Sequence, residues 1–411
     1  GILDEMKQQL EQTGIKSLLN FMWLMIKTST LEHPIKNSYR HYEDYNQLSN
    51  IQLLEEIHHA AILAVNLTPY RTFRYYNSQK FSLNRYIYSY LKDKFDQNPN
   101  YITLGQKQSK LMRHSPDIVI DKADESNFSK PACYVKKQQQ MITIVIRGTA
   151  NGSDTMVDLN ADQVQQDGFY VHSGFLWHAQ TIFRDLQSQH LINENYNYIC
   201  TGHSMGGAVA CLLGYLLYKH FFEEHMDLPQ PALYQSKIRS FGFGSAQTGC
   251  IKFNEFSKRF CLTVVNGFDF IPSVSMHGMY CQQQRLLFEN NKLFDTDETE
   301  NLKQKVRLDQ VKFQNPGQVF DYTSAQIFEV LSDKPTMFEI SQLCTRQNDI
   351  FVGGNVYHYI RGKMYEISVH DISELAFSEP SMLDHFGYLW VAEQIEDMVK
   401  RLKLQQQKSG Q

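Results

Sequence analysis

Residues 198–207 read Tyr-Ile-Cys-Thr-Gly-His-Ser-Met-Gly-Gly, and they carry the strongest signal for the fold class in this chain. It contains a G-x-S-x-G pattern centred on Ser204, preceded by a strand-like run and followed by the apolar run 205–222. A sharp strand-to-helix turn needs small residues beside a serine that it holds exposed above a sheet. The pattern alone is weak, but in this context it predicts that Ser204 is a nucleophile.

Strand-like and helix-like segments alternate on both sides of this turn. Two strands are predicted within 132–149, joined by a turn at glutamines 138–140, and a hairpin turning at 361–362 is predicted within 355–368. Further strands are predicted at 196–201, 238–244 and 262–266. Helices are predicted at 46–66, 171–188, 205–222 and 385–403. Strands that are continuously apolar are typical of a sheet buried on both faces. The alternation predicts an α/β fold with a mostly parallel central sheet and helices on both faces.

The composition excludes several classes of protein. The chain has 411 residues, 42% of them apolar, and a net charge of −4, which argues against a disordered protein and against a nucleic-acid partner. Its seven cysteines are an odd number without a CxxC pair, which disfavours a disulfide scaffold and a structural zinc site. We therefore expect no metal, no cofactor and a reducing compartment.

The longest apolar run near the start is Leu18–Ile26, which is far shorter than the ~20 residues needed to cross a bilayer. A helix that docks on the protein is favoured over one that lies on lipid with Trp23 at the boundary. We expect peripheral contact with a membrane surface and a reducing, cytosol-type location rather than classical secretion. A bacterial protein exported into a host cytosol fits the same features. Protein partners cannot be named from the sequence.

A serine nucleophile needs a histidine base, and the base needs a carboxylate to orient it. Asp269 directly follows the strand-like run 262–266 and is therefore favoured over acids in polar segments further along. His277 lies too close to Asp269 in the chain, and His358 lies in a strand-like alternation. His370 and His385 both lie at junctions between a loop and an element, and the residues alone do not separate them.

An acyl-transfer enzyme also needs N–H donors for the oxyanion of the tetrahedral intermediate. The backbone N–H of Met205, directly after the nucleophile, is one candidate. The second donor should follow an earlier central strand. Residues 144–149 read Ile-Val-Ile-Arg-Gly-Thr, so Gly148 allows close approach and Thr149 can offer its N–H and its hydroxyl.

Several segments together resemble the class 3 lipases, which include fungal triacylglycerol lipases and diacylglycerol lipases. They are ITIVIRGT (142–149), VHSGF (171–175), TGHSMGG (201–207), RSFGFGSAQTG (239–249), VVNGFDFIP (264–272) and PSMLDHFGYLW (380–390). The resemblance implies an α/β-hydrolase fold and, through its last segment, favours His385 over His370. The implied triad is Ser204, Asp269 and His385, with Thr149 and Met205 at the oxyanion hole. It also implies a lid over 150–160, with Met156, Val157 and Leu159 facing acyl chains.

The resemblance divides the chain into a core and additions. The predicted α/β-hydrolase core is 132–275 with 351–403; residues 1–131 form a helical extension packed on it, 98–131 being loop-like. Residues 276–350 are an irregular insertion or cap, and 404–411 a flexible tail.

The expected function is hydrolysis of a lipid ester through an acyl-enzyme, on an acylglycerol or, like a phospholipase A1, on a glycerophospholipid. An acyltransferase, a non-lipid esterase and a catalytically silent binding protein remain alternatives on the same fold.

Overall fold

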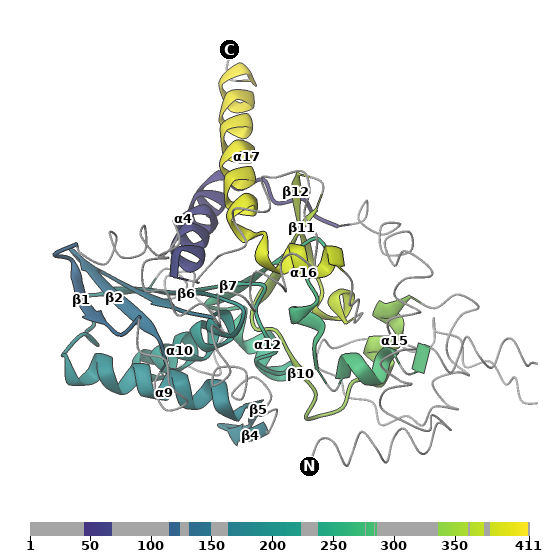
Figure 1. Cartoon of the computed structure of the whole chain (residues 1–411), viewed down its shortest axis with the longest axis horizontal. Helices are drawn as coiled ribbons and strands as arrows, with labels where there is room; N and C mark the ends of the chain where they lie inside the picture. Colours follow the sequence, from purple (N-terminus) through teal and green to yellow (C-terminus); the bar gives the residue numbers. More distant parts are fainter. Residues whose placement is uncertain are drawn as a thin grey trace, which may run out of the picture.

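Figure 1 shows the fold in a computed structural model of the chain. The structure describes residues 45–67, 115–123, 131–148, 163–222, 237–275, 277–282, 284–285, 336–360, 362–373 and 379–409. The apolar run Leu18–Ile26 lies outside these residues, and so do Thr149 and the predicted lid 150–160.

An eight-stranded sheet runs through the described part of the chain in the order β1-β2-β3-β6-β7-β9-β11-β12. Its strands are β1 (Ile118–Asp121), β2 (Cys133–Gln138), β3 (Met141–Ile146), β6 (Asn197–His203), β7 (Ile238–Phe243), β9 (Cys261–Asn266), β11 (Asn355–Ile360) and β12 (Lys363–Ile367). The five central strands, from β3 to β11, are parallel, and the edges are antiparallel. The fold is therefore the predicted α/β-hydrolase type, and the carboxyl ends of its central strands share one edge.

Helices cover both faces of this sheet (Figure 1). One face carries α9 (Ser173–Ser188), α10 (Met205–Phe222) and α12 (Ile251–Ser257). The other carries α4 (Ile51–Leu67) and α17 (Tyr388–Ser409), which pack against each other. On β6, the side chain of Cys200 faces the first layer, whereas the Thr201 hydroxyl donates to the carbonyl of Ala60 in α4 at 3.1 Å. The alternation along a strand thus divides the core into two layers.

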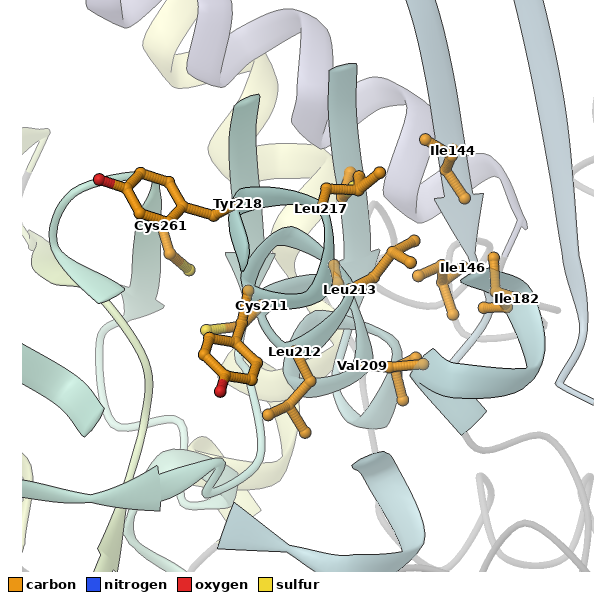
Figure 2. Close-up of a cluster of buried hydrophobic side chains, with 14 of the residues drawn as sticks. Ile144, Ile146, Ile182, Val209, Cys211, Leu212, Leu213, Leu217, Tyr218 and Cys261 are labelled. Carbon is orange, nitrogen blue, oxygen red and sulfur yellow. The ribbon is translucent and has the colours of Figure 1, made fainter. Parts of the chain in front are cut away.

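Helix α10 forms the centre of the first layer, and Figure 2 shows side chains from this cluster. The helix is apolar on nearly all sides, as expected for a helix enclosed by protein. It is also the one described helix that is long and apolar enough to cross a membrane, but most of it is buried among its neighbours. Leu212, Leu213 and Leu217 are fully buried, each contributing about 1.5–3 kcal/mol to folding.

A second, four-stranded sheet in the order β10-β8-β5-β4 lies beside the main one. It consists of β4 (Gln163–Gln166), β5 (Phe169–His172), β8 (Gly249–Cys250) and β10 (Ile350–Phe351), all antiparallel. This sheet was not predicted. Strand β8 comes directly after the turn at 244–249, and β10 lies at the end of the predicted insertion. Because these two strands pair, residue 349 is brought toward the main sheet.

Three expectations about the additions differ from the structure. Residues 118–121, expected in a loop, form β1 because their backbone pairs with β2 at the sheet edge. The predicted insertion contains α15 (Met337–Cys344), which begins with a capping box at Thr336. The predicted C-terminal helix is two helices, α16 (Glu379–Phe386) and α17, and α17 continues through 404–409, where a tail was expected. The predicted domain limits themselves stay predictions.

Candidate active site

Ser204 lies between the last residue of β6 and the first residue of α10, in a left-handed backbone conformation with φ 58°. This conformation costs a non-glycine residue about 1–3 kcal/mol. Close packing maintains it, because a Cβ on Gly206 would collide with the carbonyl oxygen of Ile146, and one on Gly202 with the backbone of Gly206. The glycines on both sides of Ser204 are therefore required sterically.

Neighbouring loops hold this turn through the backbone of Ser204. Its N–H donates to the carbonyl of Phe243 at 2.9 Å, and its own carbonyl accepts from Ala246 N at 3.3 Å. Both partners lie at the end of β7 or just beyond it. The turn is thus fixed by the adjacent parallel strand as well as by its own sequence.

His385, in the last turn of α16, reaches Ser204 across the sheet edge. Its Nε2 lies 3.1 Å from Ser204 Oγ, and its Nδ1 lies 2.8 Å from Asp269 Oδ1. All three residues are buried, with side chains of His385 and Asp269 exposed by only 6% and 0%. Since the carboxylate can only accept, Nδ1 carries the proton and Nε2 is left to accept from the serine hydroxyl.

Tyr388 orients the carboxylate from the first position of α17. Its hydroxyl lies 2.8 Å from Asp269 Oδ2, while Ile271 N donates to Oδ1 at 3.0 Å. Burial, and then the charge of Asp269, raises the pKa of Tyr388 well above its usual value. Its hydroxyl therefore stays protonated at neutral pH and can donate to the carboxylate. Tyr388 lies within the family-like segment 380–390, but the sequence gives no signal for its contact with Asp269.

Two buried groups beside the triad have shifted pKa values. Burial lowers the pKa of His203 well below its usual value, so that its neutral ring donates from Nε2 to the carbonyl of His385 at 2.8 Å. Burial, and then the nearby Asp269, raises the pKa of Asp384 to about 6, although Phe268 N donates to this carboxyl group. These contacts hold the end of α16 that carries His385, the candidate base.

Of the two predicted oxyanion donors, the structure describes one. Met205 is the first residue of α10, so its N–H has no acceptor within the helix and lies at the positive end of the helix dipole. Gly148 approaches so closely that a Cβ there would lie 2.6 Å from the carbonyl oxygen of His203 and 3.3 Å from Ser204 Cβ. Thr149 follows Gly148 but lies outside the described residues.

A cleft opens beside Ser204. Its walls include apolar side chains such as Phe175, Ile271 and Val274, together with the polar side chains of Gln247, His277 and Asp349. The last two come from the predicted insertion. The cleft thus has an apolar part and a polar part, which is the composition expected of a site for an amphiphilic small molecule.

Residues 143–279 match the family described as Lipase (class 3). Over this segment the chain is similar to the class 3 lipases. It contains the elbow, Met205 and Asp269, and the predicted resemblance is confirmed. His385 lies beyond it, in an element that the match does not reach.

Individual relatives agree with this class 3 lipase match over limited lengths. Diacylglycerol lipase-beta of Mus musculus is 24% identical over 164 residues, which are 36% of this chain and 22% of that protein. A lipase of Rhizopus niveus is 30% identical over 143 residues, which are 33% of this chain and 34% of that protein. The solved structure of the lipase from Rhizopus microsporus var. chinensis aligns with a TM-score of 0.35 at 20% identity, covering 56% of this chain and 70% of that one. The chain thus matches about a fifth to a third of its curated relatives' length.

The other candidate histidines lie away from Ser204. His358, in β11, donates to the carbonyl of Gly267 at 2.6 Å, and burial lowers its pKa to about 4. His370 lies on the 3-10 turn η5 (Val369–Ile372) with its Nδ1 2.9 Å from Ser341 Oγ, and burial lowers its pKa to about 3. Of the four candidate histidines, only His385 is hydrogen-bonded to Ser204 within the part of the chain that the structure describes.

His277 belongs to a second Ser–His–Asp arrangement, here named the buried relay: Ser341, His277 and Asp349. His277 Nδ1 lies 2.9 Å from Asp349 Oδ2, and its Nε2 lies 2.8 Å from Ser341 Oγ. Sequence analysis missed the relay because its members are 64 and 72 residues apart and share no motif.

The described part of the chain contains cysteines and other groups able to bind a metal ion. All seven cysteines are buried, and none forms a disulfide with another described residue. Within the described ranges, no group of three or more histidines, cysteines or acids is placed to hold a metal ion.

Proposed function

We propose that this chain hydrolyses carboxylic esters of a glycerolipid through an acyl-enzyme on Ser204. The observation that carries the proposal is the continuous hydrogen-bonded path from Ser204 Oγ through His385 to Asp269, at 3.1 and 2.8 Å, at a strained elbow beside a cleft. The class 3 lipase match over 143–279 supports the ester chemistry independently of this geometry.

In the proposed mechanism, His385 Nε2 accepts the hydroxyl proton as Ser204 Oγ attacks the ester carbonyl. The Met205 N–H, and by resemblance Thr149, stabilise the developing oxyanion, and each such donor contributes about 2.7–4 kcal/mol. His385 then protonates the leaving alkoxide. In the second half, it activates a water molecule that releases the fatty acid and restores the serine.

Asp269 and Tyr388 support both halves of this cycle. Asp269 stabilises the imidazolium that forms on His385 and keeps Nδ1 protonated. The Tyr388 hydroxyl and the Ile271 N–H hold the carboxylate at 2.8 and 3.0 Å, so that it does not rotate away from the ring.

The finer features of the function stay predictions. A glycerophospholipid substrate, a lid carrying Met156, Val157 and Leu159, and peripheral membrane contact rest on the resemblance and on residues outside the described ranges. Transfer of the acyl group to an acceptor other than water shares the same acyl-enzyme, so it must be separated by its products.

A fluorophosphonate probe tests the nucleophile. We expect the wild type to be labelled at Ser204, with labelling lost in Ser204→Ala. Ser341→Ala is the matched control, because Ser341 is also bonded to a histidine that contacts an aspartate but is fully buried. It should label like the wild type. Mass spectrometry of the products from a lipid panel then separates hydrolysis from transfer. A folded wild type that is neither labelled nor active would mean a silent binding protein.

A further inference from the structure

The polar wall of the cleft begins close to the nucleophile. Gln247 follows Ala246, whose N–H donates to the carbonyl of Ser204 at 3.3 Å. Gln247 and Ser204 line the same cleft. Gln247 therefore lies close to the position of the ester that Ser204 attacks.

Gln247 has a buried acceptor without a donor. Its side chain is 7% exposed, its Nε2 donates to the carbonyl of Pro272, and its Oε1 has no hydrogen-bond partner among the described residues. The amide cannot be turned around, because the carbonyl of Pro272 accepts only from the nitrogen end. An unpaired buried carbonyl is a rare feature in a folded protein, and it calls for an explanation.

Asp349 adds a second acceptor on the same wall. Its Oδ2 accepts from His277 Nδ1 at 2.9 Å and from Arg346 N at 2.8 Å. Its Oδ1 has no hydrogen bond within the part of the chain that the structure describes, and its side chain is 12% exposed. His277 offers no ring nitrogen to the cleft, since its Nε2 is bonded to Ser341 Oγ.

Two acceptor oxygens select the chemistry of the ligand. A fully esterified glycerol offers only acceptors and would leave Gln247 Oε1 unpaired. A phosphate group would add negative charge beside the carboxylate of Asp349. A hydroxyl group donates, and a site built to bond a hydroxyl rejects analogues that lack it.

We infer that Gln247 Oε1 and Asp349 form a hydroxyl-binding subsite, which favours lipid esters with a free hydroxyl near the scissile ester. This inference rests on the proposed function. The hydroxyl can come from the glycerol of a partial acylglycerol or from the sugar of a glycolipid, and both share this chemistry.

The test compares kcat/KM of the full chain on a diacylglycerol and on the same lipid with its hydroxyl capped as a methyl ether. We expect the wild type to prefer the free hydroxyl about tenfold or more. In Gln247→Met, which has a similar volume but no acceptor, the preference should fall to about twofold or less. Gln282→Met is the matched control, because Gln282 is also buried, its Oε1 has no hydrogen-bond partner among the residues that the structure describes, and it does not line the cleft. It should keep the wild-type preference.

Two further lipids in the same micelles distinguish the sources. If a monogalactosyl diacylglycerol is hydrolysed faster than the diacylglycerol and this advantage is lost in Gln247→Met, the subsite binds a sugar hydroxyl. If the diacylglycerol is hydrolysed faster, the subsite binds the hydroxyl of the glycerol. Phosphatidic acid should be the poorest substrate.

Equal kcat/KM on free and capped lipid in the wild type overturns the subsite but leaves the ester hydrolase intact, and this measurement needs no variant to fold. A folded Gln247→Met variant that keeps the full preference overturns the subsite as well. No turnover of any lipid and no probe labelling would overturn the proposed function too.

Discussion

The triad at the cleft and the buried relay contain the same three residue types at nearly the same distances. In the triad, aspartate to histidine is 2.8 Å and histidine to serine is 3.1 Å; in the relay they are 2.9 and 2.8 Å. Hydrogen-bond geometry alone would therefore assign a nucleophile to either region.

The surroundings of the two serines differ. Ser204 precedes a helix N-terminus, has φ 58° and lines a cleft. Ser341 lies inside α15, is fully buried, and its Oγ also lies 2.9 Å from His370 Nδ1 and 2.7 Å from Ser373 Oγ. What separates a nucleophile from a structural serine here is access to substrate and N–H groups for an oxyanion. Four predictions test this distinction.

The largest expected effect concerns the two histidines that the residues alone do not separate. His385→Ala should lower kcat about 10⁴-fold or more, because the serine loses its base. His370→Ala should retain turnover within about tenfold, since His370 contacts Ser341 rather than Ser204. Steady-state ester hydrolysis by both folded variants is the measurement. If His370→Ala lost far more turnover than His385→Ala, His370 rather than His385 would be the catalytic base.

The second prediction concerns acid stability. Burial, then the charges of His277 and Lys258, lowers the pKa of His370 to about 3. Below pH 6.5 the unfolded chain therefore takes up a proton at this position that the folded chain does not, so stability present at neutral pH is lost as the pH falls. Between pH 7 and pH 4.5 this amounts to about 3 kcal/mol.

Urea unfolding at the two pH values, for the wild type and His370→Asn, measures this loss. The variant should lose about 3 kcal/mol less than the wild type, because asparagine does not titrate. Equal losses of stability in both proteins would mean that groups other than His370 cause the acid sensitivity.

The third prediction breaks the relay itself. Ser341→Ala leaves His277, His370 and Ser373 without a shared partner, so the free energy of unfolding should fall by about 1–3 kcal/mol. Ester turnover should stay close to that of the wild type. If turnover falls by orders of magnitude while the protein stays folded, the relay contributes directly to the chemistry.

The smallest effect is expected on the triad side. Tyr388→Phe removes the hydroxyl that lies 2.8 Å from Asp269 Oδ2 while keeping the ring. We expect kcat to fall about fivefold to tenfold, equivalent to ~1 kcal/mol, because the carboxylate that orients His385 is less firmly held. An unchanged kcat would mean that Ile271 N is sufficient to hold it.

Sequence predicted those parts of the fold whose signal is local. The run 205–222 is apolar apart from Lys219 and His220 in its last turn, and α10 has those limits. The continuous branched residues before Arg147 likewise form a buried central strand. By contrast, β4 is a polar QVQQ segment, and β8 and β10 have two residues each, so their pairing depends on neighbours brought together by the fold.

The site divides in the same way. Ser204 is marked by its own turn, and Asp269 by the strand before it. The histidine that reaches Ser204 is 181 residues away in the chain, so only the resemblance favoured His385 over His370. Gln247 and Tyr388 lie within segments that resemble the family, but their roles could not be predicted from the sequence. An unpaired oxygen or a hydroxyl contact is visible only in the folded structure.

The pairing of α4 with α17 determines how short a working fragment of this protein can be. Trp390 and Val391 follow Tyr388 in the layer that α4 closes. Lys403 Nζ is 2.5 Å from Glu55 Oε1, and Arg239 pairs with Glu56. Helices α4 and α17, which lie near the two ends of the described residues, thus cover one face of the sheet together. An expression fragment started at the family-matched segment would leave this face bare and α17 without the helix it packs against. The minimal autonomous unit for biochemistry therefore begins before Ile51.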